Sequence, residues 1–127
     1  MTIELYLQYT SEDQVFMKRS DSVCPIAKSL DIIGDKWSLL IIRDLFAGKT
    51  LYKEFMRSPE GIATNILASR LKRLEEMKVI RTVGSGDNGK RKAYELTDAG
   101  KALYPVLDSV ANWGLAHIPG TEKRIEI

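Results

Sequence analysis

The sequence predicts one mainly α-helical domain that carries a single short β-hairpin. Along most of the 127 residues, apolar side chains recur every three or four positions, which is the period of an amphipathic helix. Near the middle of the chain the pattern changes to two short runs typical of strands, with a glycine-rich turn between them. A hydrophobic content of 44% is enough to form a core in a chain of single-domain length.

The chain divides into three parts. Residues 23–114 form the predicted domain. Residues 1–22 are expected to be an extension, in which a short strand over 2–9, where apolar and polar side chains alternate, precedes a mostly polar linker. Residues 115–127 are expected to be an irregular tail.

Two helices are expected to open the domain. Cys24 and Pro25 begin the first, because proline suits the first turn of a helix, where its missing N–H is not needed. Gly34 ends this helix, and Asp35 is placed to cap the second, which ends at Gly48. The second helix is apolar around much of its circumference, so we expect it at the centre of the core.

A short helix, a tight turn and a longer helix follow. Thr50 is expected to cap the short helix, and residues 58–61 (Ser-Pro-Glu-Gly) predict the turn. The longer helix is expected from about Thr64 to Lys78, with a buried stripe of leucines at Leu67, Leu71 and Leu74.

The hairpin and a last helix complete the domain. Residues 79–83 and 93–97 are the predicted strands, joined by a glycine-rich tip. The last helix is expected to begin after Thr97 and to carry an apolar stripe over residues 103–113. Pro105 should kink this helix or limit its first turns.

This order of elements is that of a winged helix-turn-helix between about Thr50 and Thr97. In such a unit the second helix fits the major groove of double-stranded DNA, and the hairpin lies beside the duplex as a wing. Residues 48–92 carry 11 Lys and Arg against 5 Asp and Glu, whereas the net charge of the whole chain is only +2. This concentration of positive charge indicates a polyanionic partner, although a solvated basic surface would also account for the charge alone.

The candidate DNA contacts belong to three groups. Helix N-terminal positions lie nearest the bases, and asparagine and arginine can each form two hydrogen bonds with a base. Hydroxyls and helix N-terminal amides bind phosphate well, so the start of the short helix suits phosphate contacts. The candidates are Thr50, Tyr52 and Lys53 for phosphate, Thr64, Asn65, Ser69, Arg70 and Arg73 on the longer helix, and Lys90, Arg91 and Lys92 on the wing.

The candidates on the longer helix and on the wing have alternative interpretations that do not involve DNA. The two arginines of the longer helix can instead pair with Glu75, Glu76 or other nearby carboxylates. Asn65 can cap the helix, and the basic residues of the wing can serve only to keep a turn soluble.

The composition argues against an enzyme. The chain has a single histidine, His117, and a single cysteine, and no Cys/His cluster with the spacing of zinc ligands. Phosphate-binding glycine motifs are missing, so no cofactor and no metal is expected. The longest apolar run, residues 39–42, is far short of the ~20 needed to cross a bilayer, and no signal-peptide core is present. We therefore expect a cytoplasmic protein without a membrane partner.

Several motifs resemble those of HxlR-type bacterial regulators and cover about residues 24–114 in order. They are Cys24-Pro25-Ile26, Ile33-Gly34-Asp35-Lys36-Trp37, residues 40–45, Gly61-Ile62, residues 67–75, Tyr94-Glu95-Leu96-Thr97 with Gly100, and Pro105-Val106-Leu107 with Trp113-Gly114. The resemblance implies a homodimeric winged-helix transcription factor related to the MarR type. In that family the terminal helices form the dimer, and two recognition helices bind a pseudo-palindrome with half-sites about 10 bp apart.

The chain departs from this family at one capping position. Ala63 stands where the family often has serine, and Thr64 is expected to take over the capping, which would shift the helix start by one residue. The apolar stripe over residues 103–113 also favours a homodimer, because the small core leaves it no partner. The alternative is that this stripe packs on the first helix of the same chain.

Cys24 is a candidate redox or electrophile sensor. A helix N-terminus favours the reactive thiolate, and Lys28 lies one turn along. In some HxlR-type members the cysteine before the proline senses oxidants or electrophiles such as quinones and aldehydes. The alternative is a small buried residue that never reacts.

Two further functions are compatible with the pattern. A small-molecule effector could bind between the dimer helices near Trp37 and Trp113. The other is a winged-helix protein-interaction module that does not recognise DNA sequence, although the basic middle of the chain argues against it.

Overall fold

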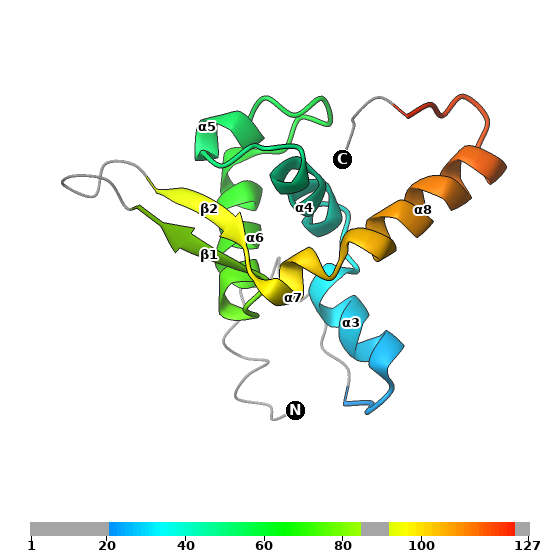
Figure 1. Ribbon diagram of the computed structural model, residues 1–127, viewed down its shortest axis with the longest axis horizontal. Helices are drawn as coiled ribbons and strands as arrows, with labels where there is room; N and C mark the ends of the chain where they lie inside the picture. The colour runs from blue at the N-terminus through cyan, green and yellow to red at the C-terminus, as the bar shows by residue number, and fades with distance from the viewer. Residues whose placement is uncertain (1–20, 85–91, 124–127) are drawn as a thin grey trace.

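The computed structural model describes residues 21–84 and 92–123. Its elements, in order, are α3 (Pro25–Ile33), α4 (Ser38–Phe46), α5 (Tyr52–Phe55), α6 (Thr64–Glu76), β1 (Ile80–Val83), β2 (Ala93–Leu96), α7 (Asp98–Lys101) and α8 (Tyr104–His117) (Figure 1). Helices dominate and the two strands pair antiparallel, so the predicted winged helix-turn-helix is confirmed.

Helix α4 lies at the centre of the core, as its apolar circumference predicts. It is surrounded by α6, by α5 and by the base of the hairpin (Figure 1). The core residues come from every element except α3 and α7: Ile41, Ile42, Leu45, Phe55, Ile62, Leu67, Leu71, Leu74, Val79, Ile80, Tyr94, Leu96 and Leu107.

The corner between α3 and α4 is organised by Asp35. Pro25 occupies the first turn of α3, and Gly34 follows its last residue, as predicted. The Asp35 carboxylate accepts hydrogen bonds from the N–H groups of Trp37 at 3.0 Å and Ser38 at 3.2 Å. Asp35 therefore caps α4 from a position two residues before the formal N-cap, Trp37.

The hairpin is held to the start of the helix-turn-helix. Ile80 pairs with Leu96 and Val83 with Ala93 in the two-stranded ladder. The Tyr94 N–H donates to the Thr50 carbonyl at 2.9 Å, so a short stretch before α5 lies along β2. This contact fixes the wing relative to the helix-turn-helix.

The sequence predicts a single long C-terminal helix, but the structure has two helices there, α7 and α8. Thr97 caps α7 by accepting from the Gly100 N–H at 3.2 Å, and α7 ends at Lys101. Pro105 then lies in the first turn of α8, where a proline is best tolerated. Helix α8 runs to His117, so the expected irregular tail from residue 115 begins about one turn too early.

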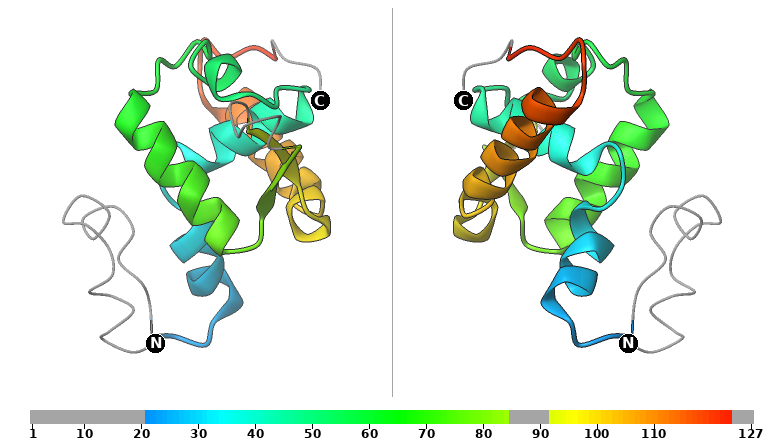
Figure 2. Two further views of the ribbon diagram at one scale, coloured as in Figure 1. Left: turned by 90° about the vertical axis from the view of Figure 1, so that its left-hand side faces the viewer. Right: turned by 90° about the vertical axis from the view of Figure 1, so that its right-hand side faces the viewer.

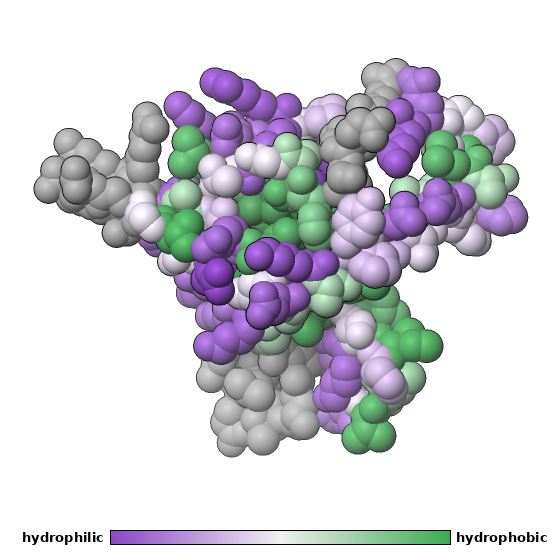
Figure 3. Space-filling model, viewed as in Figure 1, coloured by the Kyte–Doolittle hydropathy of each residue, from purple (hydrophilic) through white to green (hydrophobic). Residues whose placement is uncertain are grey.

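Two helices leave apolar faces exposed. Beyond Leu107, α8 extends away from the core, and α3 lies at the lower edge of the molecule (Figures 1 and 2). Hydrophobic residues gather over α3 and the outer part of α8 (Figure 3). The exposed large apolar side chains on these two helices and beside their ends are Val23, Ile26, Leu30, Tyr104, Val106, Val110, Trp113, Leu115 and Ile118. Trp113 is 61% exposed and Ile26 72%, so the alternative that α8 covers α3 of the same chain is wrong.

Three sequence predictions lie outside the described residues. They are the strand over 2–9 and the wing residues Lys90 and Arg91. Within the described part of the chain, no helix combines the length and apolar character needed to cross a membrane.

Candidate nucleic-acid interface

Helix α6 has one buried and one exposed side. Leu67, Leu71 and Leu74 lie in the core, as predicted. The outer side carries Thr64, Asn65, Ala68 and Lys72, all exposed, with Ser69 half-buried at its border. We call these five residues the α6 outer stripe. Its polar groups are able to form hydrogen bonds with base edges in a groove.

The start of α6 differs from the prediction. Ala63 is the N-cap, and it contributes no side-chain hydrogen bond. Thr64 is the first helical residue, so it does not take over the capping. Instead its carbonyl accepts a hydrogen bond from the Tyr52 hydroxyl of α5 at 2.6 Å. Tyr52, predicted to contact phosphate, thus connects the two helices of the helix-turn-helix.

Arg70 and Arg73 lie on the inner side of α6. Only 2% of Arg70 and 3% of Arg73 is exposed. Arg70 Nε is 3.0 Å from Asp35 Oδ2, and Arg73 donates to the Asp31 carbonyl. The expectation that the two arginines contact bases is not supported by these positions. The alternative that Arg70 pairs with a carboxylate is confirmed, and the carboxylate is that of Asp35.

The spacing of the leucines in α6 indicates that Arg70 lies on the inner side of the helix. Arg70 follows Leu67 by three residues and precedes Leu74 by four, which puts all three on one helix face. The helical period thus predicts the inner side for Arg70, against the usual preference of arginine for the surface.

The start of α5 is occupied by the side chain of Glu54. Its Oε1 accepts from the N–H groups of Thr50 at 2.8 Å and Leu51 at 2.9 Å, and these hydrogen bonds lower the pKa of Glu54. Leu51 rather than Thr50 is therefore the N-cap. The N–H groups of Thr50 and Leu51 are therefore already hydrogen-bonded, whereas the side chains of Thr50 and Lys53 remain exposed.

A buried carboxylate holds the turn between α5 and α6. Asp44 on α4 is 2% exposed and accepts hydrogen bonds from Arg43 at 2.9 Å and from the Ser58 hydroxyl. Arg43 also pairs with Glu60 at 2.8 Å, and this hydrogen bond raises the pKa of Arg43 and lowers that of Glu60. Lys49 lies 3.7 Å from Asp44. The sequence predictions did not include these residues. The available signal was Asp44, a carboxylate within the largely apolar run of α4.

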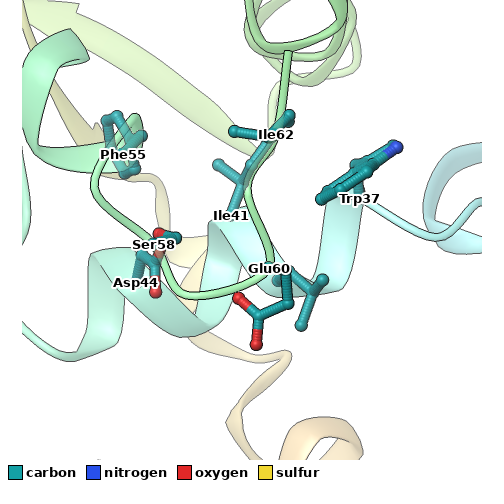
Figure 4. Close-up of a pocket in the computed structure, with 8 residues that line it drawn as sticks. Trp37, Ile41, Asp44, Phe55, Ser58, Glu60 and Ile62 are labelled. Atoms are coloured by element: carbon teal, nitrogen blue, oxygen red, sulfur yellow. The ribbon is translucent and has the colours of Figure 1, made fainter.

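The cavity beside this network is too small for an effector. It is lined by Trp37, Ile41 and Phe55 together with Ser58, Glu60 and Ile62 (Figure 4), and its volume is about 10 Å³. That is room for about one water molecule. Trp37 lines this cavity, whereas Trp113 does not.

Only some of the charged residues of the wing lie in the part of the chain that the structure describes. Lys92 is exposed immediately before β2. Arg81 on β1 pairs with Glu95 on β2 at 3.0 Å, an exposed ion pair of a kind that contributes little to stability.

Cys24 is exposed and is the N-cap of α3. Its N–H donates to the Ser22 hydroxyl at 3.0 Å. The alternative of a buried cysteine that serves only for packing is therefore wrong. Among the described residues, no three His, Cys, Asp or Glu side chains are grouped so that they could hold a metal ion.

Comparisons with known proteins agree with the fold. The family described as HxlR-like helix-turn-helix matches residues 32–122. An uncharacterized HTH-type transcriptional regulator of Mycobacterium tuberculosis is 31% identical over 97 residues, which are 76% of this chain and 61% of the relative. The match thus spans about three fifths of that relative's length.

Solved structures are similar over most of the chain. The crystal structure of PA1607 has a TM-score of 0.75 at 40% sequence identity, and the match covers 87% of this chain and 77% of that one. The redox regulator HypR in its reduced form has a TM-score of 0.69 at 26% identity, over 76% of this chain and 95% of that one. The chain therefore belongs to the HxlR-like helix-turn-helix family of transcriptional regulators.

Proposed function

We propose that this transcriptional regulator binds a specific, pseudo-palindromic DNA site as a homodimer, with one α6 in each of two successive major grooves. The observation that carries the proposal is the α6 outer stripe. It is an exposed, mostly polar surface on a helix whose other side is fixed in the core, and such rigidity is what precise base contacts need. We further propose that the protein acts in the cytoplasm, where bacterial DNA lies.

The proposed contacts differ in part from those expected from the sequence. Thr64, Asn65 and Ser69 remain candidates for base contacts. Lys72 replaces Arg70 as the basic candidate on α6, because its side chain is exposed one turn beyond Ala68, and it is proposed to contact a phosphate. Lys53, Thr50 and Lys92 are proposed phosphate contacts, together with Lys90 and Arg91 of the wing.

The homodimer is proposed to form through α8 with help from α3. Exposed apolar side chains gathered on a helix mark interaction sites, and a two-fold contact would bury both copies of the face at once. Two recognition helices related by a two-fold axis would then contact half-sites about 10 bp apart.

The outer stripe is tested by removing one charge from it. Lys72→Met is expected to weaken binding at any sequence and to lower the slope of log affinity against log salt by about 1, since one phosphate contact is lost. Asn65→Ala is expected to cost about 1–3 kcal/mol and to relax the preference at one base pair. Fluorescence anisotropy at several salt concentrations, on a genomic fragment that the wild-type protein enriches, measures both.

Lys101→Met is the matched control, because it removes the same charge from α7. Its affinity and salt slope should equal those of the wild type. If Lys72→Met behaved like this control, the proposed register of α6 on DNA would be wrong.

We also propose that Cys24 senses oxidants or electrophiles. The proposal is supported by its exposure, by its place at the α3 N-cap, and by the similarity to HypR, a redox regulator whose reduced and oxidised forms are both known. With a quinone as the electrophile, the thiolate adds to the C=C bond. An S–C bond forms as the C=C π bond breaks, and the resulting enolate takes up a proton that replaces the one the thiol released to water.

The reactivity of Cys24 decides this proposal. Cys24 is expected to react with iodoacetamide faster than glutathione does at neutral pH, because its thiol is exposed at the α3 N-cap, on the positive end of the helix dipole. As the chain has no other cysteine, mass spectrometry of the intact protein reports this one site. A rate no higher than that of glutathione would exclude a sensor role.

A further inference from the structure

Arg70 and Arg73 extend from α6 to the same place, the end of α3 and its connection to α4. The Arg70 side chain is 3% exposed and its partner Asp35 is 2% exposed, with 3.0 Å between Nε and Oδ2. Arg73 donates through Nη2 to the backbone carbonyl of Asp31, in the last turn of α3. These contacts join positions 35 and 42 residues apart in the sequence.

Asp35 connects Arg70 to the first turn of α4. Its Oδ2 accepts from the N–H groups of Trp37 and Ser38 as well as from Arg70, and its Oδ1 accepts from the Ser38 hydroxyl at 2.5 Å. Because one carboxylate is shared between the corner and α6, the helix cannot move against the corner without breaking hydrogen bonds. The burial of both partners makes an unpaired charge there costly.

Helix α3 is attached to the molecule mainly at its C-terminal end. Ile32 and Ile33 pack against the core, whereas Ile26 and Leu30 on the first turns are exposed, and no residue of α3 is fully buried. The exposed face of α3 is thus connected to the rest of the molecule through the end of the helix where Asp31 lies and through the adjoining corner with Asp35. Figure 2 shows α3 running below the end of α6 in both views.

We propose that Arg70 and Arg73 are positioning residues that contact no base and instead set the orientation of α6 relative to α3. In a dimer that uses α3 and α8, they connect the subunit contact to the recognition helix, and so determine whether both α6 helices fit their half-sites. This inference rests on the DNA-binding homodimer proposed above.

Salt dependence separates a positioning residue from a contact. A side chain that neutralises a phosphate releases a counterion and adds to the salt slope, whereas a buried side chain that orients a helix does not. Arg70→Gln is expected to weaken binding to the enriched genomic fragment at least tenfold with an unchanged slope. Lys72→Met, measured in parallel, is expected to lower the slope of log affinity against log salt by about 1.

A double variant tests whether Arg70 acts through Asp35. Asp35→Asn alone should also weaken binding. Arg70→Gln combined with Asp35→Asn replaces the ion pair by two uncharged amides and leaves no unpaired buried charge. The pair should therefore recover part of the affinity that Arg70→Gln loses. If Arg70→Gln fails to fold, the double variant carries the test.

Hydrogen exchange provides a readout that a general loss of stability does not reproduce. In Arg70→Gln, exchange should rise over residues 31–38, and in Asp35→Asn it should rise in α6, while the hairpin amides stay as protected as in the wild type. Exchange that rose equally in every element would mean that the pair only stabilises the fold, and the proposal would fail.

Two DNA-binding results would overturn the inference. One is a salt slope reduced in Arg70→Gln as it is in Lys72→Met, because Arg70 would then contact DNA. The other is wild-type affinity in a folded Arg70→Gln variant. If the wild-type protein enriched no DNA at all, the proposed function would fail instead, and the exchange experiment would still report on the contact between α3 and α6.

Discussion

Val110→Glu is expected to give a folded monomer whose affinity for its DNA site is about 100- to 10,000-fold lower than that of the wild type. The side chain of Val110 lies on the outer part of α8 and is 54% exposed, so a carboxylate there disturbs nothing within one chain. In a two-fold contact the substitution would place two carboxylates in an apolar interface without partners, which is strongly unfavourable.

The loss of DNA affinity follows from the loss of the second half-site. When two recognition helices are linked, binding of the second is intramolecular and gains from a high effective concentration. A monomer retains one α6 and only the contacts of one half-site. The weakening should therefore be far larger than any single contact substitution on the outer stripe produces.

Sedimentation velocity and anisotropy on the same preparations measure the two effects. Asn112→Glu is the control, since Asn112 is exposed on α8 but lies on its polar side, where its amide contacts Asp108. This control adds the same charge and should remain dimeric. A Val110→Glu protein that sedimented as a dimer would exclude α8 as the subunit contact.

Gly100→Ala is expected to destabilise the fold by about 3 kcal/mol, at the upper end of the usual cost of overpacking. A Cβ at this buried position would lie 2.2 Å from the Val79 carbonyl oxygen and 2.9 Å from Leu96 Cδ2. The Val79 carbonyl cannot retreat easily, because it accepts hydrogen bonds from both the N–H and the hydroxyl of Thr97 at 3.0 Å. Helix α7 would have to move away from the hairpin instead.

Urea unfolding of Gly100→Ala and Gly114→Ala measures this effect against a matched substitution. At Gly114 a Cβ would meet only Ile118 Cδ1, at 4.0 Å, so alanine should stabilise α8 by up to about 1 kcal/mol. Both variants are made in the Val110→Glu background, so that subunit contacts do not contribute. Equal stability of the two would contradict the close packing at Gly100.

Local patterns in the sequence predicted the elements well. The leucine spacing of α6, the two strands and the capping by Asp35 all depend on residues a few positions apart, and each is found in the structure. The break before α8 was harder to place. Pro105 signalled it, but a proline is compatible both with a kink and with a new first turn.

The candidate interface was less predictable, because its decisive contacts join distant residues. Nothing near Arg70 in the sequence indicates Asp35 as its partner. The same holds for Arg43 and Glu60, which are 17 residues apart. Glu54 is a short-range example of the same difficulty. It lies four residues from Thr50, and its carboxylate provides the capping that was expected from the Thr50 side chain. A long charged side chain has several partners within reach, and only the folded arrangement decides among them.

The outer stripe of α6 has a consequence for how such regulators diverge. Asn65, Ala68 and Lys72 project from the molecule, and none of them belongs to the core, whereas the residues that hold α6 in place lie on its other side. Substitutions on the stripe therefore cost little folding stability, so selection can alter them freely. After a gene duplication, descendants of this chain could acquire new DNA targets by a few surface substitutions while keeping the same scaffold.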